Sequence, residues 1–465
     1  MEKYAKRFTK QEKSWILYDW ANSVYATNIM AAIFPIYFGA VCESAGVDNV
    51  QVWGYGTSAA TLVVAVMGPV LGAVGDHKGM KKKLFTGFLA AGVLFTLMMA
   101  VFDQWQLLLA GYVISYIGFA GSCLFYDSFL TDVTTEERMD RVSSWGYAMG
   151  YIGGSTIPFV ISIAVLLIMG MDNPAAVKFS VVITSVWWLI FSIPILKNVN
   201  QTHYIEAPAS KLLSHTFQSL KKTLREIFRN KTIFIFIIAY FFYIDGVGTV
   251  IHMATSYGTN LGLDTTGMII ALLVTQIVAM PCSILFGRAS GKFSSIKLIL
   301  FAIAMYLVIC VLGFYMGFHV EQAELDYIIR DHDAAKQAEL SKAADPQGYQ
   351  SALAFSQTLF WIMAVLVGTV QGGVQAISRS YFGKLVPPEK SNEFFGFFDI
   401  FGKFATVMGP AIVALISGLT GRDSIGVLSV SVLFLIGGGL LIGFRSHFTA
   451  EAAERSKQAA KNDAG

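Results

Sequence analysis

Long apolar runs alternate with short polar connections along almost the whole chain. Twelve such runs can be distinguished, and each approaches the roughly 20 residues that a helix needs to cross the hydrocarbon core of a bilayer. Their centres lie near Ser23, Val64, Leu94, Gly118, Ile152, Trp187, Ile244, Val274, Met305, Val365, Met408 and Phe434. The pattern predicts an all-α polytopic membrane protein with twelve transmembrane helices.

The composition agrees with a membrane protein. Hydrophobic residues make up 55% of the 465 residues and charged residues 14%, whereas soluble proteins carry about a quarter charged residues. The four cysteines are scattered and show neither a disulfide framework nor metal-ligand spacing. We therefore expect no metal, no cofactor and no nucleic-acid partner.

The charges between the runs indicate which connections lie in the cytoplasm. Short connections after the first, third and seventh runs hold acids without Lys or Arg, whereas connections after even-numbered runs are basic. The basic residues are Lys78, Lys81, Lys82, Lys83, Arg138, Arg141, Lys221, Lys222, Arg225, Arg288, Lys292, Arg379 and Lys384. Because Lys and Arg stay on the cytoplasmic side, we expect both termini in the cytoplasm, and the protein in a bacterial inner (plasma) membrane.

The chain divides into two halves of six runs around a long basic connection. Within it, KLLSHTFQSLKKTLREIFRNK places apolar residues at helical spacing among lysines and arginines, which is typical of an amphipathic helix along the inner leaflet. We expect an N-terminal six-helix bundle over 1–197, this linker over 198–231, a C-terminal six-helix bundle over 232–448 and a cytoplasmic tail over 449–465. An acidic, alanine-rich insertion near 319–351 falls on the external side, and its role stays open.

Acidic residues lie inside some of the apolar runs. Asp19 lies in the first run and Asp245 in the seventh. A charge near the centre of a membrane helix costs roughly 3 kcal/mol on insertion scales, and such residues usually face a cavity, a partner or a pathway. Each acid could carry a coupling proton, because access to one side or the other can change its protonation. Each could equally form a structural ion pair or an interhelical hydrogen bond.

The connection between the second and third runs carries a motif, GAVGDHKGMKKKL, from Gly72 to Leu84. Gly72 lies four residues after Gly68, a spacing that allows close helix packing, and an acid at a helix corner can complement a helix N-terminus. The segment resembles the loop motif of the major facilitator superfamily, G-x-x-x-D-[RK]-x-G-[RK]-[RK]. The matching residues, to which we assign a gating role, are Gly72, Asp76, Gly79, Lys81 and Lys82. His77 departs from the motif, because it stands where Arg or Lys is usual.

The corresponding loop between the eighth and ninth runs, FGRASGKFSSIK, keeps glycines and a lysine but lacks the acid. LYDWANSVYATNI (17–29), SWGYAMGYIGG (144–154) and the stretch 370–410 resemble one branch of the superfamily. That branch includes fungal vacuolar amino-acid effluxers linked to autophagy, and bacterial relatives. The resemblance implies two pseudo-symmetric six-helix bundles, and the external insertion is a departure from it.

The resemblance further implies that runs 1, 4, 7 and 10 line a central cavity. Each of these runs carries polar or aromatic residues at helical spacing. The predicted substrate-binding residues are Asp19, Asn22, Tyr25, Tyr126, Asp245, His252, Trp361, Gln371 and Gln375, and the predicted coupling residues are Asp245 and Asp19. One such stripe could serve interhelical hydrogen bonding, but four together favour a hydrated pathway.

The sequence therefore predicts a secondary active transporter that moves a small polar organic solute by alternating access. An amino acid or related zwitterion is the first expectation for the solute, and H⁺ or Na⁺ for a coupling ion. An exporter of drugs or amphipathic compounds, and a non-transporting membrane sensor or scaffold on the same fold, remain alternatives. Neither a Walker-type motif nor a hydrolase motif is present, so we expect no enzyme. The expected partners are the solute and the lipid bilayer, and we expect a monomer.

Overall fold

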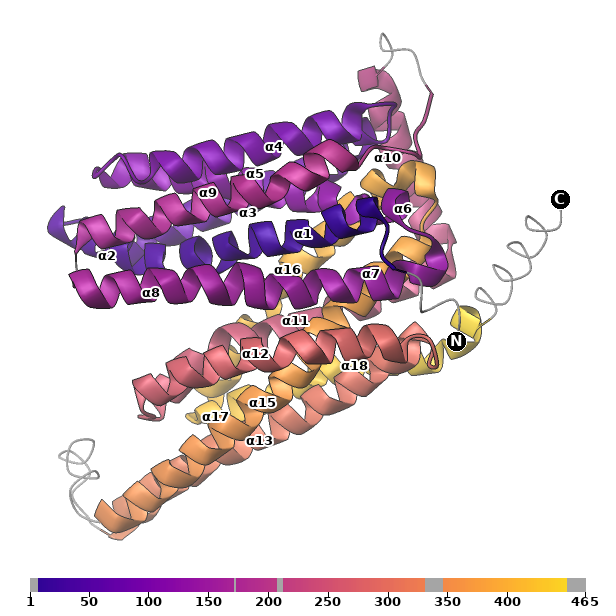
Figure 1. Cartoon of the computed structure of the whole chain (residues 1–465). Coiled ribbons are helices and arrows are strands. Elements are labelled where there is room, and N and C mark those ends of the chain that lie inside the picture. The colour runs from indigo at the N-terminus through magenta and orange to yellow at the C-terminus, as the bar shows by residue number, and fades with distance from the viewer. Residues whose placement is uncertain (1–6, 171–172, 207–211, 331–345, 450–465) are drawn as a thin grey trace. The chain divides into compact units, whose positions relative to one another are not determined.

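The protein is built from α-helices and their connections (Figure 1). The computed structural model describes residues 7–170, 173–206, 212–330 and 346–449, so part of the predicted external insertion and almost all of the predicted tail lie outside the described residues. Within the described ranges, the one β pairing is a parallel bridge between His77 and Ile205. The all-α prediction is confirmed.

The helices of the first half of the chain are α1 (Lys10–Tyr25), the π-helix η2 (Ala26–Ala32), α2 (Ile33–Ser44), α3 (Asn49–Gly75), α4 (Met80–Met98), α5 (Trp105–Ser128), α6 (Leu130–Val133), α7 (Glu136–Met149), the π-helix η3 (Gly150–Thr156), α8 (Ile157–Met169) and α9 (Pro174–Asn198). Those of the second half are α10 (Leu212–Arg229), α11 (Lys231–Asn260), α12 (Thr265–Ala289), α13 (Ser295–Arg330), α15 (Pro346–Leu385), the 3-10 turn η6 (Pro388–Lys390), α16 (Ser391–Thr420), α17 (Asp423–Ser429) and α18 (Ser431–Gly443).

Ten helical stretches within the described residues are long and apolar enough to cross a membrane. Ten of the twelve predicted centres fall in them, and the other two fall in α4 and α16. Both helices exist: α4 starts with Lys81, Lys82 and Lys83, and α16 contributes Met408–Thr420 as a shorter apolar helix among the described residues. A polytopic membrane protein is therefore established, and the number twelve stays a prediction.

The described residues form two compact units. Unit 1 comprises Met1–Phe234, Ser283–Ser295 and Ala376–Lys403. It thus holds α1 to α10 together with the ends of α12, α15 and α16 that border the basic loops. Its core is aromatic, with Trp15, Tyr18 and Trp188 fully buried. The polar tips of these rings find partners, because Tyr18 donates its hydroxyl to Ser122 at 2.9 Å.

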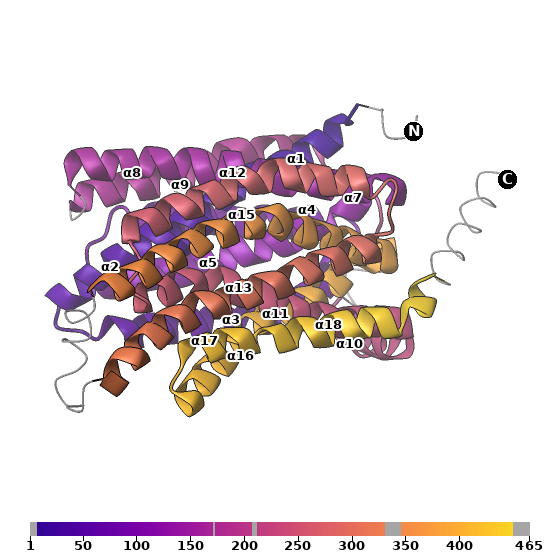
Figure 2. The ribbon, with the colours of Figure 1, turned by 90° about the horizontal axis from the view of Figure 1, so that it is seen from below.

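Unit 2 comprises Ile235–Cys282, Ile296–Gln375 and Phe404–Gly465. Figures 1 and 2 show α12, α13 and α15 running side by side within it. Two hydrogen bonds join these helices: Ser356 of α15 donates to the Met316 carbonyl of α13, and Thr275 of α12 donates to the Ala364 carbonyl of α15. The predicted domains, with boundaries at 197, 231 and 448, are continuous stretches of the chain, whereas each compact unit combines several stretches. The predicted domain boundaries stay a prediction.

Two π-helical stretches interrupt the α-helices of unit 1, in the first and fifth predicted spans. η2 holds Asn28, whose fully buried amide donates to Ser162 and Thr184 at 3.1 and 3.0 Å. η3 is rich in glycine, and Gly154 lets Ser23 of α1 approach. Such π-helical turns are rare and are frequently found at functional sites. The backbone conformation of the first and fifth spans is therefore a further reason to look for function there.

The linker forms α10, which packs on the first turn of α16 within unit 1. Ser219 donates to Glu393 at 2.8 Å, and Lys390 pairs with Glu226 at 2.8 Å. The opposite side of α10 exposes Phe228. This arrangement agrees with an amphipathic helix, and its predicted place along the inner leaflet stays a prediction.

Candidate functional site

Arg379 of α15 is a buried cation at the centre of unit 1. Its Nη1 donates to Asp127 Oδ1 at 2.9 Å, and its Nη2 donates to Asp19 Oδ2 at 3.2 Å. Its Nε donates to the Ser143 hydroxyl at 3.0 Å. Tyr126 donates its hydroxyl to the same oxygen of Asp19 at 2.7 Å. The site therefore joins α1, α5, α7 and α15, and we call these five residues the arginine centre.

Aromatic rings surround the guanidinium of the arginine centre. Arg379 Cζ lies 4.7 Å from the ring centroid of Trp15, 4.5 Å from that of Tyr147 and 5.3 Å from that of Tyr126. Trp15 and Tyr126 are stacked with their centroids 4.4 Å apart. Cation–π contacts attract a cation without cancelling its charge. The rings therefore hold the guanidinium in position and leave its charge available to the acids.

Gly146 explains how α7 comes so close to this centre. A Cβ at Gly146 would lie 3.1 Å from Arg379 Nη2 and 3.2 Å from the Trp15 ring, and it would overlap the Asp19 carboxylate. A side chain here would displace the charged groups, so only glycine fits. The stretch SWGYAMGYIGG thus owes one of its glycines to the packing of the arginine centre.

The arginine centre contains more acid than base. Two carboxylates share one guanidinium, and Asp399 of α16 also acts electrostatically on Asp127. The side chain of Asp19 is 11% exposed and that of Asp127 is 31% exposed, whereas that of Arg379 is 5% exposed. An excess negative charge at a buried site is costly. A proton or a small cation on one carboxylate would remove it.

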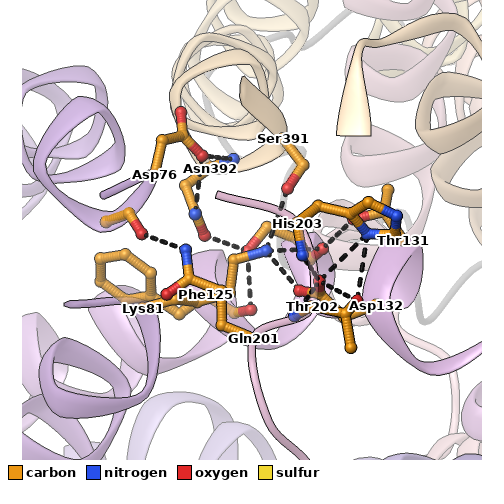
Figure 3. A network of polar contacts seen from close by, with 12 residues as sticks. Asp76, Lys81, Phe125, Thr131, Asp132, Gln201, Thr202, His203, Ser391 and Asn392 are labelled. Carbon is orange, nitrogen blue, oxygen red and sulfur yellow. Dashed lines mark hydrogen bonds and ion pairs between the residues drawn. The ribbon is translucent and has the colours of Figure 1, made fainter. Parts of the chain in front are cut away.

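Asp76 follows the last residue of α3 and caps a different helix, α16. Its Oδ1 accepts the backbone N–H of Asn392 at 2.9 Å and the Asn392 side-chain amide at 2.8 Å, and its Oδ2 accepts the backbone N–H of Glu393 at 3.0 Å (Figure 3). Burial raises the pKa of Asp76 to about 7, although Lys81 and these N–H donors act in the opposite direction. The acid of the motif therefore complements a helix N-terminus, as the sequence suggested.

Both glycines of the motif have a structural reason. A Cβ at Gly72 would lie 2.8 Å from the carbonyl carbon of Asn392, so α3 and the start of α16 touch backbone to backbone. Gly79 precedes α4 with φ of 72°, a left-handed conformation that favours glycine. The motif thus specifies one close approach and one turn.

Lys81 carries the next part of the network. Its fully buried ammonium pairs with Asp132 at 2.7 Å and donates to the Ser391 hydroxyl at 3.0 Å (Figure 3). Asp132 Oδ1 also accepts the backbone N–H groups of Thr202 and His203 at 2.8 and 2.9 Å. Buried lysines need such partners. Lys81 therefore ties α4 and α6 to the start of α16.

Residues 199–206, which we call the strap, close this end of unit 1. The Ile205 N–H donates to the Asp76 carbonyl at 2.8 Å, and the Gln201 side chain donates to the Gly75 carbonyl at 3.0 Å. His203 Nδ1 lies 3.3 Å from Asp132, and this contact raises the pKa of His203, while burial opposes the shift. The strap therefore holds a histidine that binds more tightly when it is protonated.

The loop FGRASGKFSSIK between α12 and α13, which lacks the acid of the motif, also allows a close approach of helices, and an acid of α7 binds beside it. A Cβ at Gly287 would lie 2.7 Å from Ser144 Cβ of α7, so this glycine also brings two helices together. Asp140 of α7 pairs with Lys384 at 2.6 Å and accepts the Ser295 hydroxyl at 3.2 Å. This loop therefore remains a packing device despite the loss of its own acid.

Asp245 lies fully buried in α11 of unit 2. Its Oδ1 accepts the backbone N–H of Gly409 at 3.1 Å, and its Oδ2 has no hydrogen-bond partner among the described residues. The same holds for the hydroxyl of Thr249, one turn along α11. His252, which the sequence places on the same face, is exposed. Asp245 is thus half-satisfied, unlike Asp19.

The remaining predicted site residues differ in burial. Gln371 is buried with its Nε2 unpartnered among the described residues, and Gln375 donates its amide to the Gln371 carbonyl at 3.1 Å. Trp361 is half-buried. Asn22 is buried beside Cys123, and Tyr25 is fully buried with its hydroxyl 2.8 Å from that of Ser115. Tyr25 therefore occupies a packing position, and Gln371 keeps an amide free to bind.

The structure brings Asp19 and Tyr126 together, and it adds residues that sequence reasoning did not select. Asp127, Asp132 and His203 had no assigned role. Arg379 was placed at the end of the polar stripe of the tenth run and among the basic residues of the following connection, without a predicted partner. Asp127 was recognisable as a further acid in an apolar run, directly after Tyr126 in the fourth stripe. The partners of Arg379 lie 236 to 360 residues away along the chain, so no local pattern could have revealed them.

The family described as "Vacuole effluxer Atg22 like" matches residues 51–329 and 344–453. The chain is 43% identical over 442 residues to the MFS-type transporter YxiO of Bacillus subtilis (strain 168), covering 93% of this chain and 94% of that protein. It is 24% identical over 325 residues to autophagy-related protein 22-1 of Aspergillus fumigatus, covering 66% of this chain and 48% of that protein. It therefore spans about half the length of this fungal relative.

A solved structure agrees on the fold. The MFS proton:xylose symporter XylE superposes with a TM-score of 0.65 at 11% identity, covering 94% of this chain and 95% of that one. This likeness shows the major facilitator fold, with its two helical bundles, and the prediction that the chain is not an enzyme is confirmed by its family. The protein is an integral membrane transporter of the major facilitator superfamily and belongs to its Atg22-like family.

Proposed function

We propose that the protein is a proton-coupled secondary transporter of a small zwitterionic solute, with amino acids first, and that it works by alternating access. The observation that carries this proposal is the arginine centre, where Asp19 and Asp127 share the single guanidinium of Arg379. Neutralisation requires one further positive charge. A proton supplies it without disturbing the recognition of a zwitterion, whose own net charge is zero.

The two acids have different tasks in this proposal. Asp19 accepts both the Tyr126 hydroxyl and Arg379 on one oxygen, so its charged form is well stabilised. The Asp127 carboxylate pairs with Arg379 and is the more exposed of the two acids. We therefore assign the exchangeable proton to Asp127 and a fixed charge to Asp19. This revises the sequence prediction, which placed coupling on Asp19 and Asp245.

Zwitterion recognition follows from the same groups. A guanidinium binds a carboxylate in a planar, bidentate manner, and an ionised acid beside an aromatic ring suits an ammonium group. Arg379, the fixed charge of Asp19 and the ring of Tyr126 lie together and offer both charges. An α-amino acid carries its two charges a few ångströms apart and matches this arrangement.

Unit 2 supplies a second candidate for coupling. Asp245 is buried with one carboxylate oxygen unpartnered among the described residues, and Thr249 beside it has an unpartnered hydroxyl. A buried carboxylate without a counter-charge favours a bound proton. Within unit 2 the proposed solute contacts remain Gln371, Gln375, Trp361 and His252. Within unit 1, Asn22 remains a proposed solute contact.

The network of Asp76 and Lys81 is proposed as the gate. Asp76 holds the first turn of α16, and Lys81 binds Ser391 in the same turn. Alternating access requires such contacts to break and re-form. The flanking residues support this gate: Gly72 allows the close approach to α16, Gly79 allows the turn before α4, and Lys82 binds Asn200.

The proposed location is the bacterial plasma membrane, with both termini in the cytoplasm. A cysteine at Glu43, an exposed residue near the end of α2, should then react with an impermeant maleimide added outside intact cells. A cysteine at Lys221 on α10 should react only after the cells are permeabilised. The reverse pattern would overturn this orientation.

The function is tested by ligand screening followed by flux. Thermal unfolding of the purified protein is measured with each of the twenty amino acids, and the stabilising ones are tested for saturable uptake into proteoliposomes. The proposal predicts uptake that accumulates against a gradient when the pH differs across the membrane. The absence of amino-acid uptake, together with transport of amphipathic dyes, would favour the drug exporter instead.

A further inference from the structure

An open groove of about 670 Å³ lies beside the first turns of α4 in unit 1. Its volume falls within the ~300–1,000 Å³ range of small-molecule sites. Residues of α4 spaced by three and four line one side, and the strap lines the other. The lining residues are Gly79, Lys82, Lys83, Thr86, Gly87, Asn200 and Gln201.

The groove carries positive charge without a lining acid among the described residues. Lys82 donates to the Asn200 side chain at 2.8 Å and keeps two further N–H groups. Lys83 is exposed. Thr86 donates its hydroxyl to the Lys82 carbonyl and Gln201 donates its amide to the Gly75 carbonyl, so the donors that the lining offers a ligand are mainly those of its two ammonium groups. Such a lining suits a phosphate-like anion.

The same face of α4 continues as an apolar stripe. Ala90, Leu94 and Leu97 follow Lys83 and Gly87 at helical spacing, and all are exposed. Leu94 is 54% exposed and Leu97 is 39% exposed. α4 lies at the outer edge of unit 1 in Figure 1. One helix face therefore presents lysines at its start and open apolar side chains beyond them.

We propose that this groove binds the headgroup of an anionic phospholipid, with an acyl chain along Leu94 and Leu97. The charge of the lysines complements the phosphate, and basic pockets at membrane helices bind anionic lipid headgroups in this way. The apolar stripe favours a lipid over a soluble phosphate, because a free anion has no use for it. Gly87 leaves space beside the lysines, since a Cβ there would meet no atom within 4 Å.

Lipid binding at this groove bears on the gate. Lys82 lies next to Lys81, which holds Ser391 of α16. Asn200 of the strap lies three residues before His203, which contacts Asp132. A headgroup between α4 and the strap would hold these two segments together. The binding itself does not depend on which solute is transported.

Native mass spectrometry of the purified full-length protein tests the proposal. Phosphatidylglycerol and phosphatidylcholine with identical acyl chains are titrated, and the wild type should prefer phosphatidylglycerol. In the double variant Lys82→Ala, Lys83→Ala the apparent Kd for phosphatidylglycerol should rise about 30-fold, since each lysine near an anionic headgroup is worth about 1 kcal/mol. The double variant Lys292→Ala, Lys297→Ala removes the same charge outside the groove and should change the Kd less than about twofold.

A second variant separates space from charge. Gly87→Leu fills the groove, keeps both lysines, and improves helix propensity, so it should fold and still lose phosphatidylglycerol binding. Equal binding of phosphatidylcholine, or unchanged binding in Gly87→Leu, would overturn the proposal. Displacement of phosphatidylglycerol by inorganic phosphate at equal concentration would also overturn it, because the site would then be one for a soluble anion.

Discussion

The substitution Asp76→Ala removes the acceptor for three hydrogen bonds at the start of α16. The lost partners are the backbone N–H and side-chain amide of Asn392 and the backbone N–H of Glu393. Losing an N-cap costs about 1–2 kcal/mol, and a buried donor left without a partner costs about 1–3 kcal/mol. We therefore expect opening of the first turn of α16 to become easier by about 3 kcal/mol, which is a factor of roughly 100.

Hydrogen exchange measured by mass spectrometry reads this opening directly. The peptide that contains Asn392 and Glu393 should exchange about 100-fold faster in Asp76→Ala than in the wild type, while the aromatic core around Trp188 keeps its protection. Asp103→Ala is the matched control, because that acid is exposed and pairs with Lys178 of α9, away from α16. Unchanged exchange at the start of α16 would refute the capping role, and a uniform loss of protection would show general destabilisation instead.

Three further changes test other contacts by thermal unfolding. Burial raises the pKa of Asp76 from its ordinary value of 3.8 to about 7 in the fold. The wild type should therefore lose stability relative to Asp76→Asn as the pH rises from about 4 through 7; a pH-independent difference would contradict this. The pKa of His203 is raised in the fold. The wild type should therefore be more stable than His203→Asn below pH 6.5, and this difference in stability should disappear as the pH rises through the folded pKa. Gly72→Ala overlaps the Asn392 backbone and should cost about 1–3 kcal/mol, whereas Gly87→Ala meets open space and should not destabilise; equal effects would refute the close approach.

The membrane class and most spans were predictable because they rest on composition and run length. Ten of the twelve centres lie in long apolar stretches, and another lies in α4, whose first turn carries charges that serve contacts inside unit 1. Lys81 shortens the apolar part of α4 and pairs with Asp132. A hydropathy pattern registers such a residue only as an interruption, since the pattern does not contain the partner.

The geometry of the motif was predictable from the sequence, whereas that of the arginine centre was not. Gly72, Asp76 and Gly79 lie within eight residues, so their turn and helix corner are local features. Arg379 depends on Asp19, which lies 360 residues away. At the end of a predicted span, such an arginine looks like any basic residue that reaches the membrane surface. Only the fold shows that it is buried between two acids.

The central claim, that Asp127 exchanges the coupling proton at the arginine centre, is tested most directly by proton movement in proteoliposomes. Vesicles that hold a pH-sensitive dye are exposed to each of the twenty amino acids, and solute-for-solute exchange is measured in the same preparation. In the wild type, at least one amino acid should move protons. In Asp127→Asn, that amino acid should still exchange while proton movement is lost, and Asp103→Asn should behave as the wild type. Proton movement at the wild-type rate in Asp127→Asn, or none with any amino acid in the wild type, would contradict the account.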